Sequence, residues 1–113
     1  MFPSHDPGGG IALLNAANNI KEKTEGTNIF IEAIKYPYKT ILKNAGLEYT
    51  PQKNKGKGIN VVTGKTVNMI KEGIIDPLLV TKSALKHAAS VATTILSTDC
   101  VINNLRVGDE SNR

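Results

Sequence analysis

This sequence of 113 residues has few aromatic side chains, with no Trp and only 4% Phe and Tyr. These are the residues that bury the most area per side chain, so the core has to be built from Ile, Leu, Val and Ala. A chain of this length has room for one hydrophobic core. We therefore expect a single small domain.

Cysteine and histidine are scarce as well. Cys100 is the only Cys, which excludes an internal disulfide and is typical of a reducing compartment. His5 and His87 have no companions at metal-ligand spacing, so no metal site is predicted. No arrangement of a nucleophile with a base and an orienting acid is visible, and no catalytic residue is assigned.

Long apolar runs are missing too. None approaches the roughly 18 residues of a membrane-spanning helix, so no membrane partner is expected. The first seven residues contain neither a basic stretch followed by an apolar one nor an Arg-rich amphipathic helix, so no targeting segment is predicted. Lys and Arg exceed Asp and Glu by 14 to 10, which gives a formal net charge of +4.

Helical spacing of apolar residues predicts a first helix over residues 11–20, just after a turn-prone triple glycine. Residues 47–58 are polar and rich in Lys and Gly, which indicates a loop. Residues 59–69 contain two β-branched stretches around a Gly-Lys turn, and a small β-hairpin is predicted there.

Between these segments, proline divides a helical pattern. Asn28 or Thr27 can cap a helix that should stop or kink near Tyr36, because Pro37 disfavours helical geometry in the residue before it. Pro37 is well suited to begin a third helix, with Gly46 as its C-cap.

Asp76 and Pro77 give the strongest local signal. Asp is a good N-cap and Pro fits the first turn, so a long Ala-rich helix is predicted to follow up to about Thr98. A short strand is predicted at residues 100–102 and a frayed tail after it. The predicted helix has one broad apolar face: Val80, Ala84, Leu85, Ala88, Val91, Ala92 and Ile95.

Two glycine motifs could bind phosphate. Gly64-Lys65-Thr66 resembles the end of a Walker loop, but such a loop needs a Gly where this chain has Ile59, so a hairpin turn is predicted instead. The triple glycine at residues 8–10 precedes a helix and can bring bare backbone N–H groups to an anion, or it can be a flexible leader. Asp76 likewise can contact a ligand or serve only as an N-cap.

Several stretches, taken in order, resemble the C-terminal part of the equatorial domain of the group I chaperonins, the heat-shock chaperonin family. They are residues 8–14 (Gly-Gly-Gly-Ile-Ala-Leu-Leu), 43–46 (Lys-Asn-Ala-Gly), 67–77 (Val-Asn-Met-Ile-Lys-Glu-Gly-Ile-Ile-Asp-Pro) and 80–92. Two of them, Lys-Asn-Ala-Gly and Gly-Ile-Ile-Asp-Pro, look most like the mitochondrial branch. The resemblance implies a mainly α fold of antiparallel helices, with residues 1–7 an unmatched leader, 8–104 a partial equatorial domain and 105–113 a flexible tail.

The resemblance also implies ATP-dependent folding of non-native proteins, with ATP and magnesium as cofactors. Gly8 and Gly9 would lie against the nucleotide. The remaining implied ATP-binding residues line its adenine and ribose side: Asn60, Val61, Val62, Ile74 and Asp76. In the intact family the partners are unfolded proteins, a co-chaperonin and other chaperonin subunits. The mitochondrial matrix is the implied location, with the cytoplasm as the alternative in the absence of a presequence.

The family's Asp-Gly-Thr-Thr-Thr phosphate loop, magnesium ligand and catalytic Asp have no counterpart in this sequence. Phosphoryl transfer depends on metal and positioned charge around the phosphates. We therefore expect a chaperonin-derived chain with half an ATP pocket that does not hydrolyse ATP alone.

Two other interpretations stay open. Lys53, Lys55 and Lys57 form a basic tract, so the region up to Lys65 could be a small nucleic-acid-binding or interaction module, although it lacks interleaved aromatics. The helix over residues 77–98 could instead be an oligomerisation element, but Ser and Thr interrupt its apolar stripe, which disfavours a coiled coil.

Overall fold

The computed structural model describes residues 4–98, which form three helices and two small antiparallel sheets. The chain divides into two compact units, residues 1–81 and residues 82–113, and the boundary falls inside the last helix. This architecture confirms the predicted mainly α fold with a small hairpin. The predicted strand at residues 100–102 and the tail lie outside the described residues.

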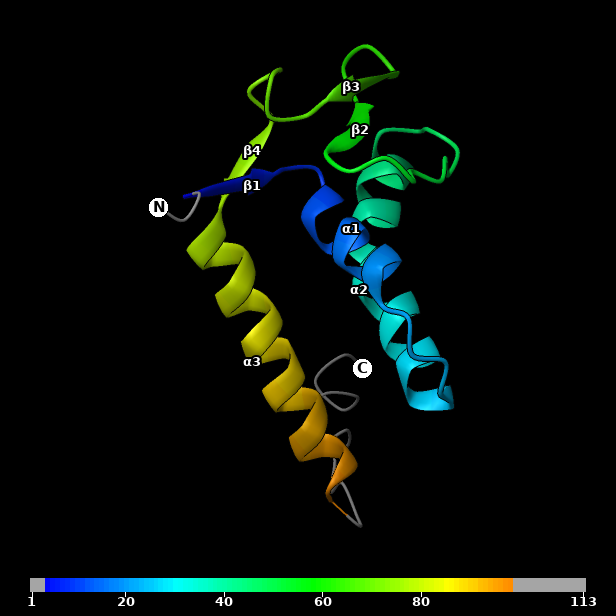
Figure 1. The fold of residues 1–113 in the computed structure, drawn as a ribbon, viewed down its shortest axis with the longest axis vertical. Helices are drawn as coiled ribbons and strands as arrows, with labels where there is room; N and C mark the ends of the chain where they lie inside the picture. Colours follow the sequence, from blue (N-terminus) through cyan, green and yellow to red (C-terminus); the bar gives the residue numbers. More distant parts are fainter. Residues whose placement is uncertain (1–3, 99–113) are drawn as a thin grey trace, which may run out of the picture. The chain divides into compact units, whose positions relative to one another are not determined.

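Two antiparallel helices form the frame of the first unit (Figure 1). Helix α1 spans Ile11–Asn19 and α2 spans Glu25–Asn44. Helix α1 buries Ile11, Leu14 and Ala17, which fall at i, i+3 and i+6 and so share one face. The predicted first helix is therefore present, and the sequence period identified its buried face.

Pro37 lies inside α2, so the helix does not stop at Tyr36, and the prediction that Pro37 begins a separate helix is wrong. Proline removes one backbone N–H and so leaves the carbonyl group of Ala33 without its helical donor. Ala33 and Pro37 both lie on the exposed side of α2, where water can satisfy that carbonyl. On the opposite side Ile34, Tyr38 and Leu42 are all buried, and this packing on either side of the proline holds the two halves in one helix.

The ends of α2 are fixed by local hydrogen bonds. Its N-cap is Thr24, not the predicted Asn28 or Thr27: the Thr24 side chain accepts from the Thr27 N–H, and the Thr27 hydroxyl accepts from the Thr24 N–H. At the other end Gly46 has a φ of 72°, and the Leu47 N–H donates to the carbonyl of Leu42 at 2.9 Å. This Schellman arrangement turns Leu47 back onto the core.

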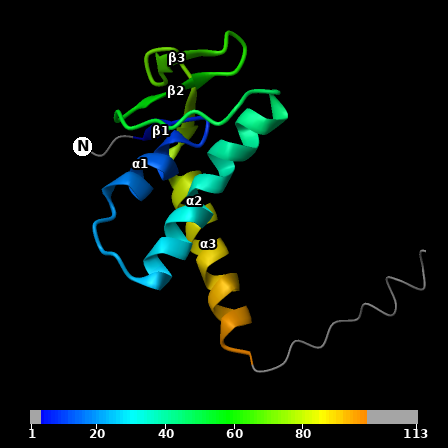
Figure 2. The same ribbon diagram turned by 90° about the vertical axis from the view of Figure 1, so that its right-hand side faces the viewer.

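A β-hairpin covers one end of the helix pair (Figure 2). It consists of β2 (Lys57–Asn60) and β3 (Lys65–Asn68), paired with Gly58 opposite Val67. Gly58 permits the close approach, because a Cβ there would lie 2.5 Å from Cγ1 of Ile11. The core cluster joins both helices and the hairpin: Ile11, Leu14, Tyr38, Leu42, Ile59 and Met69.

The second sheet joins the two ends of this unit. Strand β1 (His5–Pro7) pairs antiparallel with β4 (Ile75–Pro77), with Asp6 opposite Asp76. Hydrogen bonds on either side, from Gly8 N–H to Ile74 O and from Leu78 N–H to Ser4 O, place both prolines at positions that need no N–H. Strand β1 therefore accommodates proline, and it pairs with residues about 70 positions away in the sequence, such as Asp6 with Asp76.

Helix α3 spans Leu78–Leu96 and has no buried residue. Val91 and Ile95, both on its predicted apolar face, are more than half exposed. Among the described residues, no helix is long and apolar enough to cross a membrane.

Candidate functional site

The β1–β4 sheet brings the glycine triplet next to Ile74. Gly8 is buried and its N–H donates to the carbonyl oxygen of Ile74 at 2.8 Å. Asp76 follows two residues later in β4, directly opposite Asp6. Four of the seven residues assigned to a nucleotide site from the sequence, Gly8, Gly9, Ile74 and Asp76, therefore lie in or next to one small sheet.

Internal packing accounts for all three glycines. A Cβ on Gly8 would lie 3.1 Å from the carbonyl carbon of Ile74, and one on Gly9 would lie 2.8 Å from Cε of Met69. Gly10 is the most restricted, since its φ is 80° and a Cβ would lie 2.7 Å from Cα of Tyr38. The triplet is thus required by the fold itself and does not by itself indicate a ligand.

The N–H groups of the triplet differ in their availability. The N–H of Gly8 is used by Ile74, whereas within residues 4–98 those of Gly9 and Gly10 have no backbone acceptor. Both precede the first turn of α1, where the helix dipole favours a negative group. The triplet can therefore still offer two donors to a ligand oxygen.

Asp76 is an exposed carboxylate on β4. The prediction that it caps the last helix is wrong: α3 begins at Leu78, and the Leu78 N–H donates to the carbonyl of Ser4 instead. Within the described part of the chain the Asp76 side chain has no hydrogen-bond donor. The exposed Asp76 carboxylate, opposite Asp6 in the register, can accept a hydrogen bond from a ligand donor.

The other three assigned residues lie at the β2–β3 turn. Oδ1 of Asn60 accepts the Val62 N–H at 3.0 Å, and the Asn60 carbonyl accepts the Gly64 N–H at 2.7 Å. Val61 is 41% and Val62 91% exposed. No hydrogen bond between described residues joins this turn to β1 or β4, so the structure does not unite these three residues with Asp76. Gly64-Lys65 forms the ordinary hairpin turn that the sequence predicts.

The described residues contain no cluster of three or more His, Cys, Asp or Glu side chains that could hold a metal ion. Asp6 and Asp76 together supply only two carboxylates. Magnesium bound with a nucleotide would therefore need ligands from the phosphates and from other residues.

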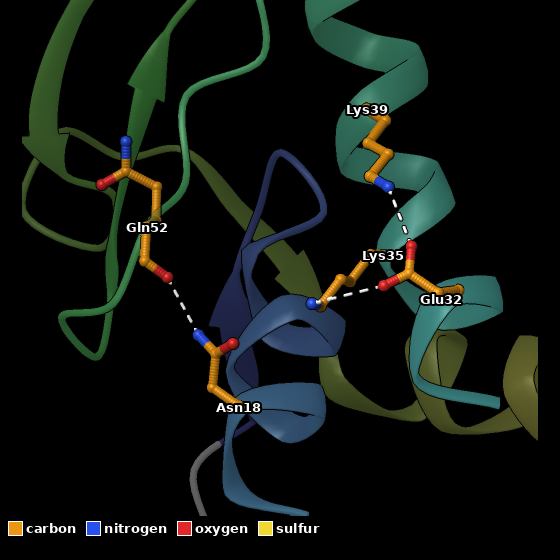
Figure 3. Close-up of polar contacts among 5 residues, drawn as sticks. All are labelled: Asn18, Glu32, Lys35, Lys39 and Gln52. Atoms are coloured by element: carbon orange, nitrogen blue, oxygen red, sulfur yellow. Dashed lines mark hydrogen bonds and ion pairs between the residues drawn. The ribbon is translucent and has the colours of Figure 1, made fainter. Parts of the chain in front are cut away.

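Sequence reasoning missed a polar pocket on α1. It is lined by Asn15, Asn18, Asn19, Lys53 and Lys55, and its volume is about 50 Å³. Asn18 donates through Nδ2 to the carbonyl of Gln52 at 2.9 Å (Figure 3). The three asparagines follow i, i+3, i+4 spacing, which places them on one face of the helix and could have revealed the pocket.

Comparison with protein families adds an independent finding to this geometry. The family model of the TCP-1/cpn60 chaperonin family matches residues 5–106. The match includes both helices of the first unit, both sheets and α3. The chain therefore belongs to the TCP-1/cpn60 chaperonin family.

Proposed function

We propose that the residues assigned from the sequence form the adenine and ribose side of an ATP site in a group I chaperonin of the mitochondrial branch. We further propose that this site serves ATP-dependent protein folding. The assigned residues are Gly8, Gly9, Asn60, Val61, Val62, Ile74 and Asp76. The family assignment and the stretches at residues 8–14 and 67–77 support this proposal. The observation that carries it is the β1–β4 pairing, which keeps the glycine triplet beside Ile74 and Asp76.

Each residue has a specific role in this proposal. The Asp76 carboxylate accepts a hydrogen bond from a nucleotide hydroxyl or amino group, and Gly9 offers an N–H to an oxygen. Ile74 is half-buried against the core and fixes the strand that bears Asp76. Val61 and Val62, next to Asn60, are exposed apolar side chains that we assign to the base, although no hydrogen bond between described residues joins their turn to the sheet that bears Asp76.

Hydrolysis is a separate requirement. ATP supplies the transferable phosphoryl group, but its reaction needs a metal ion and positioned charges around the phosphates. The described residues contain no group of three or more His, Cys, Asp or Glu side chains that could hold such a metal ion. We therefore propose that these 113 residues bind nucleotide weakly and do not hydrolyse ATP by themselves.

The exposed apolar side chains of α3 support association with chaperonin subunits. Val91 and Ile95 are 59% and 56% exposed and lie one helical turn apart. Exposed apolar side chains grouped in this way are typical of an interaction surface. Unfolded proteins and a co-chaperonin are the further partners proposed for the assembled form, with the mitochondrial matrix as its location.

A pair of variants tests the nucleotide site. Asp76→Ala and Asp6→Ala each remove one member of the same opposed pair, so both lower the negative charge of the sheet by one. We expect Asp76→Ala to weaken ADP binding about tenfold, because it removes a charged acceptor, and Asp6→Ala to leave it unchanged. Calorimetric titration measures both, and equal effects of the two variants would contradict the proposed role of Asp76.

Two further measurements test the remaining parts of the proposal. Magnesium-dependent phosphate release by the pure protein would overturn the claim that these residues do not hydrolyse ATP. Co-migration with an intact group I chaperonin in size-exclusion chromatography is expected, and it should be lost in a Val91→Lys, Ile95→Lys variant. Migration that is unaffected by the chaperonin would contradict the proposed association.

A further inference from the structure

The segment from Gln52 to Gly56 is attached to α1 at both ends. The carbonyl of Gln52 accepts a hydrogen bond from Nδ2 of Asn18 at 2.9 Å (Figure 3), and the Gly56 N–H donates to Oδ1 of Asn15 at 2.8 Å. Gln52 is also buried, with 7% of its surface exposed. Lys53 and Lys55 therefore extend from a fixed segment, and little backbone entropy remains to be lost when they bind a ligand.

The charged side chains that line the pocket have one sign. Lys53 and Lys55 line it together with three asparagines, and no carboxylate of residues 4–98 does. The ion pairs among residues 4–98 join Glu32 to Lys35 and Lys39 and involve neither pocket lysine. No carbonyl of the described residues accepts a hydrogen bond from these two lysines either, so they do not serve as caps for α1.

One buried donor in the pocket wall lacks an acceptor. Oδ1 of Asn15 receives the Gly56 N–H, which fixes the orientation of this amide, and its Nδ2 is buried with no hydrogen-bond partner among the described residues. A buried polar group without a partner is unfavourable and indicates an unfilled acceptor position. An oxygen atom bound beside Asn15 would fill it.

We propose that this pocket binds a single phosphoryl-type oxyanion. Two ammonium groups and neighbouring amide donors match the acceptor oxygens of such a group. No aromatic side chain lines the pocket to stack a base, so the phosphoryl group itself is what is recognised. None of these residues belongs to the Gly8–Asp76 sheet, so the two sites are independent.

Inorganic phosphate is the first probe, with chloride at equal ionic strength as the control. Amide spectra of the isotope-labelled full chain should show saturable shifts at the side chains of Asn15, Asn18 and Asn19 and at the backbone of residues 53–56. The same titration with a short single-stranded oligonucleotide distinguishes a polymer backbone from a free phosphate as the source. Tighter binding of the oligonucleotide at these same amides would favour the polymer.

Matched variants distinguish phosphate binding at a defined site from nonspecific attraction to the positive charge of the chain. Lys53→Gln with Lys55→Gln and Lys82→Gln with Lys86→Gln each remove two exposed lysines and lower the net charge equally. We expect at least about tenfold weaker phosphate binding in the first pair and no change in the second, because charge-assisted hydrogen bonds are lost only from the pocket. Asn19→Asp should abolish binding by adding a negative charge to the pocket lining.

The proposal is overturned if chloride causes the same shifts, if no shift saturates, or if both double variants weaken binding equally. Unchanged core resonances show in each case that the variant is folded. Because the proposed nucleotide site shares no residue with this pocket, the loss of one need not affect the other.

Discussion

Helices α2 and α3 have nearly the same length, 20 and 19 residues, but differ in what they bury. Helix α2 carries a proline and many charges, yet it buries Ile34, Tyr38 and Leu42 along one face. Helix α3 is rich in Ala and apolar residues and buries none. Helix α2 is therefore stabilised by the surface it packs against, whereas within the described residues α3 depends on the helix propensity of its own residues.

The comparison has a functional side. The packed region, residues 4–81, holds the β1–β4 sheet and the asparagine–lysine pocket. The described remainder, residues 82–98, has only exposed or half-exposed side chains. The proposed ligand sites therefore lie where the core fixes the backbone, and the proposed surface for protein partners lies in described residues that form no core.

The largest effect is expected from the same substitution made in each region. Leu42→Ala should lower the free energy of unfolding by about 2–5 kcal/mol, because it opens a cavity in a fully buried position. Leu96→Ala, at a side chain that is 86% exposed, should change it by less than about 0.5 kcal/mol. Denaturant unfolding monitored by circular dichroism measures both, and equal losses would remove the distinction between the regions.

Glycine substitutions sharpen the comparison within the packed region. Gly10 and Gly64 have φ values of 80° and 75°, but only at Gly10 would a Cβ meet other atoms. We expect Gly10→Ala to cost about 2–3 kcal/mol, from backbone strain and overpacking, and Gly64→Ala about 1 kcal/mol, from strain alone. Thermal denaturation gives both values, and a Gly10→Ala cost no larger than that of Gly64→Ala would show that Tyr38 does not press on the glycine triplet.

Tyr38 makes the stability of the core depend on pH in the alkaline range. Its hydroxyl donates to the carbonyl of Thr50 at 2.6 Å, and burial raises the pKa of the Tyr38 phenol above its usual value of 10.0. The folded state then holds this proton more tightly than the unfolded state, so stability should fall as pH rises beyond 10. Tyr38→Phe should cost about 1 kcal/mol at neutral pH and reduce this fall.

The measurement for Tyr38 is the unfolding midpoint in urea at a series of pH values up to the alkaline limit. Tyr36→Phe is the matched control, because Tyr36 is 67% exposed in the same helix. An alkaline fall that is as steep in Tyr38→Phe as in the natural protein would contradict this account.

The smallest effect is expected at the exposed face of α2. Glu32 pairs with Lys39 at 3.1 Å and with Lys35 at 3.7 Å (Figure 3), and hydrogen bonding and charge from Lys39, then Lys35, lower the pKa of Glu32 below 4.5. The small contribution of Glu32 to stability is present above the ordinary pKa of a Glu side chain. It is lost as pH falls through the lowered pKa of Glu32. Glu32→Gln should therefore be slightly less stable at neutral pH and low salt, and not at high salt.

Glu48→Gln is the control for this pair, because Glu48 has no ion pair among the described residues. Thermal denaturation at low and high salt compares the two variants. A salt-independent loss in Glu32→Gln would show that its effect does not arise from the lysines.

Local sequence patterns correctly predicted the helices and turns that are determined by neighbouring residues. The apolar spacing of residues 11–20, the Gly-Lys turn of the hairpin and the start of a helix after Pro77 could all be read from the sequence. The helix end predicted before Pro37 was wrong, because packing of Ile34, Tyr38 and Leu42 on the far side of the helix outweighs the local preference of proline. The N-cap predicted at Asp76 was wrong, because β4 is set by pairing with a distant strand.

The candidate sites, like the secondary-structure elements that the sequence predicted wrongly, depend on contacts between residues far apart in the sequence. The proximity of the glycine triplet to Ile74 and Asp76 was expected only through the family resemblance, since no local pattern links positions so far apart. The asparagine–lysine pocket depends on hydrogen bonds between residues 34 and 41 positions apart. Such contacts exist only once the core has brought α1 and the lysine segment together.

Mapping ADP binding onto the backbone amides of the full chain tests the central claim most directly. If the β1–β4 sheet forms one side of a nucleotide site, the amides of Gly9, Gly10, Ile74 and Asp76 should shift together and saturate at one concentration. If ADP instead shifts only residues 53–56, or shifts none of these amides, the sheet has no nucleotide role and the central claim is wrong.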